Sequence, residues 1–379
     1  MIDGAKSQDE HDEPDAPPEA KTDPHKASDG RTVKRINLAL QGGGSHGALA
    51  WGVLDRLLED DRIEIDGIAA TSAGSMNAVA VAQGLVEGGR EGARAMLDKF
   101  WSRISDAGRM YSIVKRTPYE KMFGDWNMDE SPAFFWFDAF TKAVSPYKYN
   151  PLGINPLRDI IDDLIDFDAV RHCGRIKLFL CATNVHTGKV RVFRTHETTS
   201  DVVMASACLP HLFHAVQIGD EYFWDGGYSG NPALFPLFYH VDSRDILIVH
   251  INPIERPEVP IAASDIHNRV NEITFNSSLL KEMRAIDFVN KLIEEDMIKD
   301  EHKHRFRQML VHSIRSDLSM RGLSVASKFD SDHDFLCYLR DLGRRSASQW
   351  LAKNFRNLNE RSTIDLRTEF LGIGSRHIG

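Results

Sequence analysis

The chain has 379 residues, 42% hydrophobic and 27% charged, which is ordinary for a soluble globular protein. The formal net charge of −9 argues against a nucleic-acid-binding protein, because such proteins usually carry a basic surface. Four cysteines without a CxxC pair are too few for a disulfide scaffold and show no zinc-binding spacing.

Residues 1–31 differ in composition from the rest of the chain. Nine acidic and four basic residues lie there, together with four prolines. Such a segment cannot bury enough apolar surface to offset its ordering entropy, so we predict a disordered acidic tail. The segment contains no apolar signal region, and no run of the chain approaches the ~18–20 apolar residues of a membrane span. We therefore expect a cytoplasmic protein.

Short strand-like and helix-like segments alternate after this tail. Apolar runs predict strands over Ile36–Leu40 and Ile63–Thr71, and helical spacing of apolar residues predicts helices over Ala48–Leu58 and Met76–Leu85. This alternation with short turns indicates an α/β fold with a parallel sheet. Further strands are predicted over Ile176–Ala182, Val190–Phe193 and Ile246–Ile251, and residues 265–355 are predicted to be mostly helical and rich in charge.

A glycine-rich loop follows the first predicted strand. Gln41–Gly47 (QGGGSHG) formally matches the G-x-G-x-x-G pattern of dinucleotide-binding proteins. That fingerprint also needs an acidic residue at the end of the second strand, where this chain has Ala70-Thr71-Ser72. The alternative is an oxyanion hole, in which successive glycines let backbone N–H groups face a cavity at a helix N-terminus.

The second predicted strand ends in Ala70–Gly74 (ATSAG), between an apolar strand and an apolar helix. A nucleophile elbow requires this context, because a sharp turn there raises a serine hydroxyl above the sheet. Ser72 is therefore a candidate nucleophile, although serine is also well suited to cap the N-terminus of the following helix.

A serine hydroxyl needs a base to become a good nucleophile. Asp225–Gly227 (DGG) ends an aromatic, strand-like run, and its glycines leave room for a substrate, but an Asp-Gly pair is equally typical of a plain turn. Histidine is the usual base of a catalytic triad. The sequence context singles out none of the nearby histidines, which are His46, His211, His214 and His250.

The order of Gln41–Gly47, Ala70–Gly74 and Asp225–Gly227 resembles that of the patatin-like phospholipase family. Ala205–Pro210 (ASACLP) is similar to a further segment of that family, and the resemblance covers about residues 34–255. It implies a three-layer α/β/α sandwich with a mainly parallel central sheet. On this basis we expect three parts: the tail, a catalytic domain over residues 32–260 and a helical C-terminal extension over residues 261–379, packed on that domain.

The resemblance also implies a Ser–Asp dyad without histidine. Ser72 would accept the acyl group, Asp225 would act as the base, and the backbone N–H groups of Gly43, Gly44 and Ser45 would hold the oxyanion. The implied reaction is hydrolysis of lipid acyl esters, as in a phospholipase A or a lipase, with no cofactor and no metal. A lipid or acyl-ester substrate further implies peripheral contact with a membrane surface.

Two positions depart from the family pattern. His46 stands where the family usually has Arg or Lys, which predicts weaker attraction of phosphate or carboxylate head groups, and Ala70 replaces the first glycine of the elbow. The same dyad would also serve a thioesterase or a polyester depolymerase, and the fold alone would serve a non-hydrolytic lipid-binding regulatory protein.

Two segments have two interpretations each. The aromatic stretch over residues 134–140 (FFWFDAF) either packs a subdomain core or touches a membrane. Asn271–Ile286 either packs on the sandwich or gates the substrate. The apolar residues that we expect to dock on the sandwich are Ile273, Leu279, Leu280 and Ile286.

Overall fold

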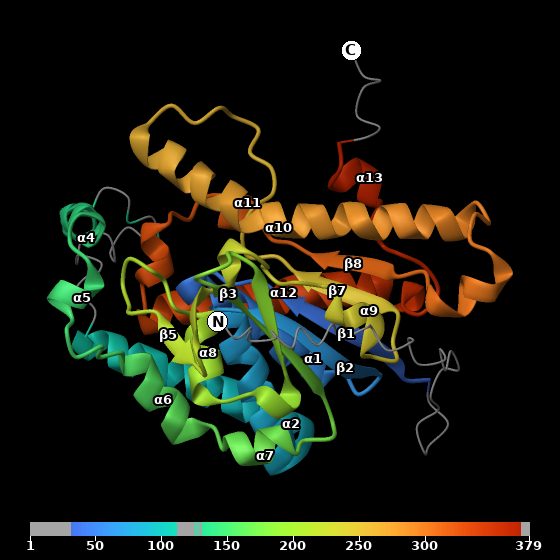
Figure 1. Cartoon of the computed structure of the whole chain (residues 1–379), viewed down its shortest axis with the longest axis horizontal. Helices are drawn as coiled ribbons and strands as arrows, with labels where there is room; N and C mark the ends of the chain where they lie inside the picture. Colours follow the sequence, from blue (N-terminus) through green and yellow to red (C-terminus); the bar gives the residue numbers. More distant parts are fainter. Residues whose placement is uncertain (1–31, 112–125, 127, 129–130, 373–379) are drawn as a thin grey trace, which may run out of the picture.

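The computed structural model describes residues 32–111, 126, 128 and 131–372. The acidic tail expected over residues 1–31 lies outside the described residues. In the described part, helices cover both faces of one central sheet, which confirms the three-layer α/β/α prediction (Figure 1).

The strands are β1 Lys34–Leu40, β2 Ile63–Thr71, β3 Lys177–Asn184, β4 Val190–Arg194, β5 Val216–Ile218, β6 Glu221–Asp225, β7 Asp245–Val249 and β8 Leu310–Ile314. The helices are α1 Ala48–Glu59, α2 Ala73–Tyr111, α4 Pro132–Ala143, α5 Pro146–Tyr149, α6 Pro156–Leu164, α7 Phe167–Arg171, α8 Ser200–Ser206, α9 Pro236–Tyr239, α10 Ala263–Glu294, α11 Asp317–Met320, α12 His333–Asn354 and α13 Leu366–Glu369. Two short 3₁₀ helices near the site are η1 Gly44–Gly47 and η5 Ala326–Phe329.

Eight strands of the described chain form the sheet in the order β5-β6-β3-β2-β1-β7-β8, with β4 also paired to β3. The five strands from β3 to β8 in this order are parallel, whereas β4 and β6 pair with β3 in antiparallel fashion, as does β5 with β6. The carboxyl ends of β1 and β2 therefore lie side by side, which brings the two loops that follow these strands to one edge of the sheet.

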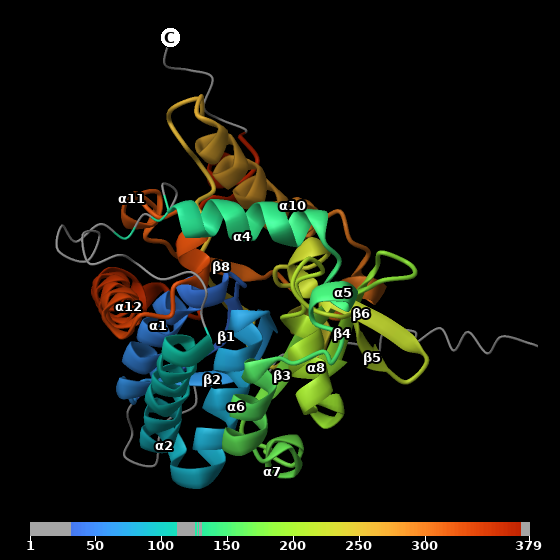
Figure 2. The same ribbon diagram turned by 90° about the vertical axis from the view of Figure 1, so that its left-hand side faces the viewer.

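The two helical layers bury opposite faces of the parallel strands. Leu38 and Leu40 of β1 belong to the core formed with α1, α2 and α12, whereas Ala39 belongs to the core formed with α9, α10 and α13. Because the strands are covered on both faces, their sequences are almost continuously apolar. Figure 2 shows α1, α2 and α12 on one side of the sheet and α10 on the other.

The C-terminal extension is present and is part of both the sheet and the helical layers. Within the segment predicted to be mostly helical, residues 310–314 form β8, which pairs in parallel with β7. The helical expectation missed this strand because it is only five residues long and contains His312 and Ser313. α12 packs so closely on α1 that a Cβ at Gly52 would lie 1.8 Å from the carbonyl oxygen of Arg340.

The length of α2 and the burial of α10 also differ from the predictions. The helix predicted over Met76–Leu85 belongs to the much longer α2, which is kinked where Gly88 and Gly89 leave helical geometry. On α10, Leu279 and Ile286 are buried as expected, but Ile273 is 54% exposed and does not dock on the sandwich.

In the described ranges, no helix combines the length and hydropathy that crossing a bilayer requires.

Candidate active site

Ser72 lies at the sharp turn between β2 and α2, and its backbone φ is +56°. This left-handed conformation costs a non-glycine residue about 1–2 kcal/mol, so neighbouring contacts must hold it. The Ser72 N–H donates to Oγ of Ser206 at 2.9 Å, and the Ser72 carbonyl accepts the N–H of Ser75 at 2.8 Å. Glycine is required two residues later, because a Cβ at Gly74 would lie 2.5 Å from the carbonyl oxygen of Leu40.

Asp225 is the last residue of β6, where the pairing with β3 sets it opposite Ala182. Its carboxylate accepts the N–H of Gly227 at 2.7 Å, and the side chain of Ser72 interacts with it as well. Burial raises the pKa of Asp225 to about 6, although the Gly227 N–H, the Ser72 side chain and the charge of Lys328 act in the opposite direction. At neutral pH the carboxylate is therefore mostly ionised and can accept a proton from Ser72.

The two glycines after Asp225 are needed for packing. A Cβ at Gly226 would lie 2.3 Å from the carbonyl oxygen of Cys181, and one at Gly227 would lie 2.4 Å from the ring of Phe275. Protein atoms occupy the space beside each glycine. A substrate therefore cannot use this space, contrary to the expectation that these glycines leave room for one. They allow β3 and α10 to approach the turn that follows Asp225 closely.

The end of α8 connects the serine and the aspartate. Ser206 is fully buried, and its Oγ lies 2.8 Å from Oγ of Ser75 in addition to accepting the Ser72 N–H. Two residues later, the carbonyl oxygen of Cys208 accepts the N–H of Asp225 at 2.8 Å. One short segment therefore positions both backbones.

The glycine-rich loop lies directly against the serine turn. A Cβ at Gly42 would lie 2.7 Å from Cβ of Ser72, and the Gly42 N–H donates to Oδ1 of Asn231 at 2.7 Å. Gly44 has a φ of +57°, and a Cβ there would lie 2.5 Å from the carbonyl oxygen of Lys328. Glycine is thus required at Gly44 both by backbone conformation and by the close approach of the C-terminal extension.

The structure brings Ser72, Asp225, Gly43, Gly44 and Ser45 to one cavity of about 280 Å³. This volume is close to the lower end of the range for small-molecule sites, roughly 300–1,000 Å³. Most of the remaining lining is apolar and comes from α2, from the loop after α8, from α10 and from η5; it includes Trp101, Ile104, Leu212, Phe213, Phe275 and Phe329. Such a lining suits an acyl chain.

No histidine among the described residues lines this cavity. His46 is buried with its Nε2 2.8 Å from Oγ of Ser327, and burial together with the charge of Lys328 lowers its pKa well below the usual value. It is therefore neutral. In the described ranges, no group of three or more His, Cys, Asp or Glu side chains is arranged to hold a metal ion.

Three site residues escaped the sequence analysis: Ser206, Asn231 and Lys328. Ser206 lies in the segment Ala205–Pro210 and is fully buried in the structure. The similarity of that segment to the family was the only sign in the sequence that Ser206 belongs to the site. Asn231 contacts the glycine loop from a different part of the chain. Lys328 lies in a charged region that offers nothing to distinguish it from solvated lysines.

The model of the family described as patatin-like phospholipase matches residues 38–238. Among solved structures, VipD from Legionella pneumophila is 14% identical with a TM-score of 0.40, and the match covers 92% of this chain and 75% of that one. ExoU from Pseudomonas aeruginosa, solved in complex with SpcU, is 14% identical with a TM-score of 0.29; the match covers 84% of this chain and 52% of that one. No curated protein matches the chain.

Proposed function

Because the chain belongs to the patatin-like phospholipase family, we propose that it hydrolyses lipid acyl esters with Ser72 as nucleophile and Asp225 as general base. The observation that carries this proposal is that Ser72 and the buried Asp225 line one apolar cavity, where the Ser72 side chain is close enough to lower the pKa of the Asp225 carboxyl. A serine becomes a useful nucleophile when a base within hydrogen-bond reach can take its proton.

The reaction runs in two halves. Asp225 takes the proton of the Ser72 hydroxyl while Oγ attacks the ester carbonyl carbon, and the protonated carboxyl then returns that proton to the departing alcohol. This leaves an acyl-enzyme. A water molecule then gives its proton to Asp225 and attacks the acyl carbon, and the carboxylic acid leaves as Ser72 regains its proton. The raised pKa of Asp225 makes it a stronger base than an exposed aspartate.

The oxyanion that forms in each half needs hydrogen-bond donors. We assign this role to the backbone N–H groups of Gly43, Gly44 and Ser45, because all three residues line the cavity beside Ser72. One such donor is typically worth roughly 10²–10³ in rate. The N-terminal end of α1 follows the loop and adds favourable potential for negative charge.

We propose that residues 32–260 form the catalytic domain and that the extension over residues 261–379 completes it. β8 continues the sheet of that domain, and Lys328 of the extension contacts the glycine loop. An extension that supplies part of the cavity wall is expected to be required for activity.

We further propose that α4 meets the lipid surface. Its inner face packs Phe134 and Phe137 against Phe329, which lines the cavity, with ring centroids 6.2 and 5.9 Å away. Its outer face leaves Phe135 and Trp136 65% and 71% exposed. An exposed aromatic face beside an acyl-binding cavity suits insertion at the interface of a bilayer. The packing interpretation of this stretch holds for the inner face, and membrane contact is our proposal for the outer face.

The test is hydrolysis of p-nitrophenyl esters of several acyl lengths by the wild type, Ser72→Ala and Asp225→Asn. We expect both variants to lose roughly 10³-fold or more in kcat while retaining the wild-type circular dichroism spectrum. A fluorophosphonate probe should label the wild type and not Ser72→Ala. Full ester hydrolysis by folded Ser72→Ala would refute the assignment, and a folded wild type that neither reacts with the probe nor hydrolyses any ester would indicate a lipid-binding protein instead.

A further inference from the structure

The cavity that contains Ser72 is mostly apolar and is lined by few charged side chains. Among the described residues that line it, Asp225 is the one acidic side chain and Lys328 the one basic side chain. In the proposed reaction Asp225 serves Ser72, whereas the Lys328 ammonium has no assigned role beyond favouring the ionised form of Asp225. A cation in an otherwise apolar cavity is costly to desolvate unless it serves a partner.

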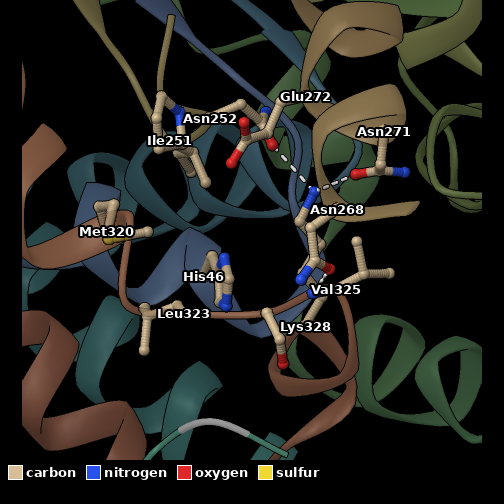
Figure 3. A pocket seen from close by; sticks show the side chains of 12 residues that line it. His46, Ile251, Asn252, Asn268, Asn271, Glu272, Met320, Leu323, Val325 and Lys328 are labelled. Carbon is tan, nitrogen blue, oxygen red and sulfur yellow. Dashed lines mark hydrogen bonds between the residues drawn. The ribbon is translucent and has the colours of Figure 1, made fainter. Parts of the chain in front are cut away.

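Lys328 belongs to η5 and is held in place by two asparagine side chains. Its Nζ donates to Oδ1 of Asn252 at 2.8 Å and to Oδ1 of Asn271 at 2.6 Å, as Figure 3 shows, and lies 5.1 Å from the centre of the Phe275 ring. Lys328 and Asn271 line both the main cavity and a small side cavity of about 10 Å³. Lys328 thus lies in the wall between the two cavities, and its ammonium has one N–H beyond these two bonds.

Among the described residues, no carboxylate forms a direct ion pair with this ammonium. Glu272 is near, but its carboxylate is already paired with Arg256 at 2.7 Å and Arg269 at 3.1 Å. His46, on the other side, is neutral. The two groups that contact Nζ directly are uncharged amides, which orient the ammonium without cancelling its charge.

We propose that Lys328 determines substrate specificity in the reaction proposed above, by favouring acyl esters that carry an anionic group, such as a phosphate, close to the scissile ester. An anion there would accept a charge-assisted hydrogen bond from the ammonium in a site shielded from water, whereas a neutral ester could not form such a bond. An uncharged His46 in the glycine loop predicts weak attraction of anionic head groups. The extension supplies the positive charge instead.

This selectivity should depend on pH. Burial lowers the pKa of Lys328 to about 8, partly offset by the charges of Glu272 on α10 and Asp225 on β6, while His46 of η1 faces it without charge. Lys328 is therefore positively charged below about pH 8 and loses its charge above that value. The preference for anionic esters is expected to be strongest near neutrality and to fade in alkaline solution.

The experiment compares two substrates with the same oleoyl chain, 1-oleoyl lysophosphatidic acid and 1-monooleoylglycerol, in micelles of a neutral detergent. We expect Lys328→Met to lower kcat/KM for the phosphate-bearing ester roughly 10-fold more than for the neutral ester, mostly through KM. Lys328→Arg should retain the preference of the wild type. Lys353→Met, which removes an exposed lysine of α12, is the matched control and should leave the ratio unchanged.

An equal loss on both esters in Lys328→Met, or an unchanged ratio, would overturn the inference. Binding of an ether-linked, non-hydrolysable analogue of lysophosphatidic acid to the wild type and Lys328→Met separates this inference from the proposed function. Weaker binding by the variant supports a phosphate contact even if no ester is hydrolysed, and equal binding contradicts it even if hydrolysis is rapid. Matching melting temperatures would show that both proteins are folded.

Discussion

Replacement of Ser206 by alanine tests whether the end of α8 holds Ser72, the nucleophile that we propose, in place. In Ser206→Ala the N–H of Ser72 loses its 2.9 Å acceptor and Oγ of Ser75 loses a 2.8 Å partner, both at buried positions. A hydrogen bond is worth about 0.5–1.5 kcal/mol, and a buried donor without a partner costs about 1–3 kcal/mol. The protein is therefore expected to lose about 1–3 kcal/mol of unfolding free energy.

The effect on activity follows from the strained backbone of Ser72. Its φ of +56° costs about 1–2 kcal/mol, so the turn relaxes more readily once its N–H is released. If the productive conformation loses about 0.5–1.5 kcal/mol, its ratio to the relaxed conformation falls roughly 2- to 13-fold and kcat falls by up to the same factor, with little change in KM. The assay is steady-state hydrolysis of a soluble p-nitrophenyl ester, with urea denaturation for the free energy of unfolding.

Two variants serve as controls. Ser200→Ala makes the same chemical change at the first residue of α8, where Oγ has no hydrogen-bond partner among the described residues, and should leave kcat unchanged. Ser75→Ala removes the second partner of Ser206 but keeps the acceptor of the Ser72 N–H, so it should reduce kcat less than Ser206→Ala does. A folded Ser206→Ala enzyme with wild-type kcat would refute the reasoning.

The remaining predictions concern pH, the lipid surface and packing. The kcat/KM profile on a neutral ester should show an acid limb near pH 6, since Asp225 must be ionised to act as a base and its pKa is raised to about 6; a limb near about pH 4 would contradict this. Phe135→Ser with Trp136→Ser should weaken binding to phosphatidylcholine vesicles in a flotation assay while hydrolysis of a soluble ester continues; loss of both would indicate misfolding. Gly226→Ala should lower the urea midpoint, at a cost of about 1–3 kcal/mol, because its Cβ would lie 2.3 Å from the carbonyl oxygen of Cys181; an unchanged midpoint would show that the backbone yields freely.

Local patterns in the sequence were sufficient for the fold class and for most of the parallel sheet. The strand predicted over Ile63–Thr71 has the same bounds as β2, because a strand buried on both faces is apolar throughout and ends at turn residues. β8 escaped prediction because five residues interrupted by His312 and Ser313 carry too little periodicity to be separated from a charged helical region. Its place in the sheet comes from pairing with β7, which no local pattern records.

In the candidate site, too, local sequence patterns predict some features and not others. The glycine loop and the elbow serine could be predicted because each has a local signature in the turn that follows β1 or β2. The residues that reach them from elsewhere follow from the three-dimensional fold: β6 pairs beside β3 and brings Asp225 near Ser72, and η5 brings Lys328 to the glycine loop. The physical reason is that such contacts depend on strand order and on the packing of segments far apart in the chain, whereas sequence patterns report only the neighbourhood of each residue.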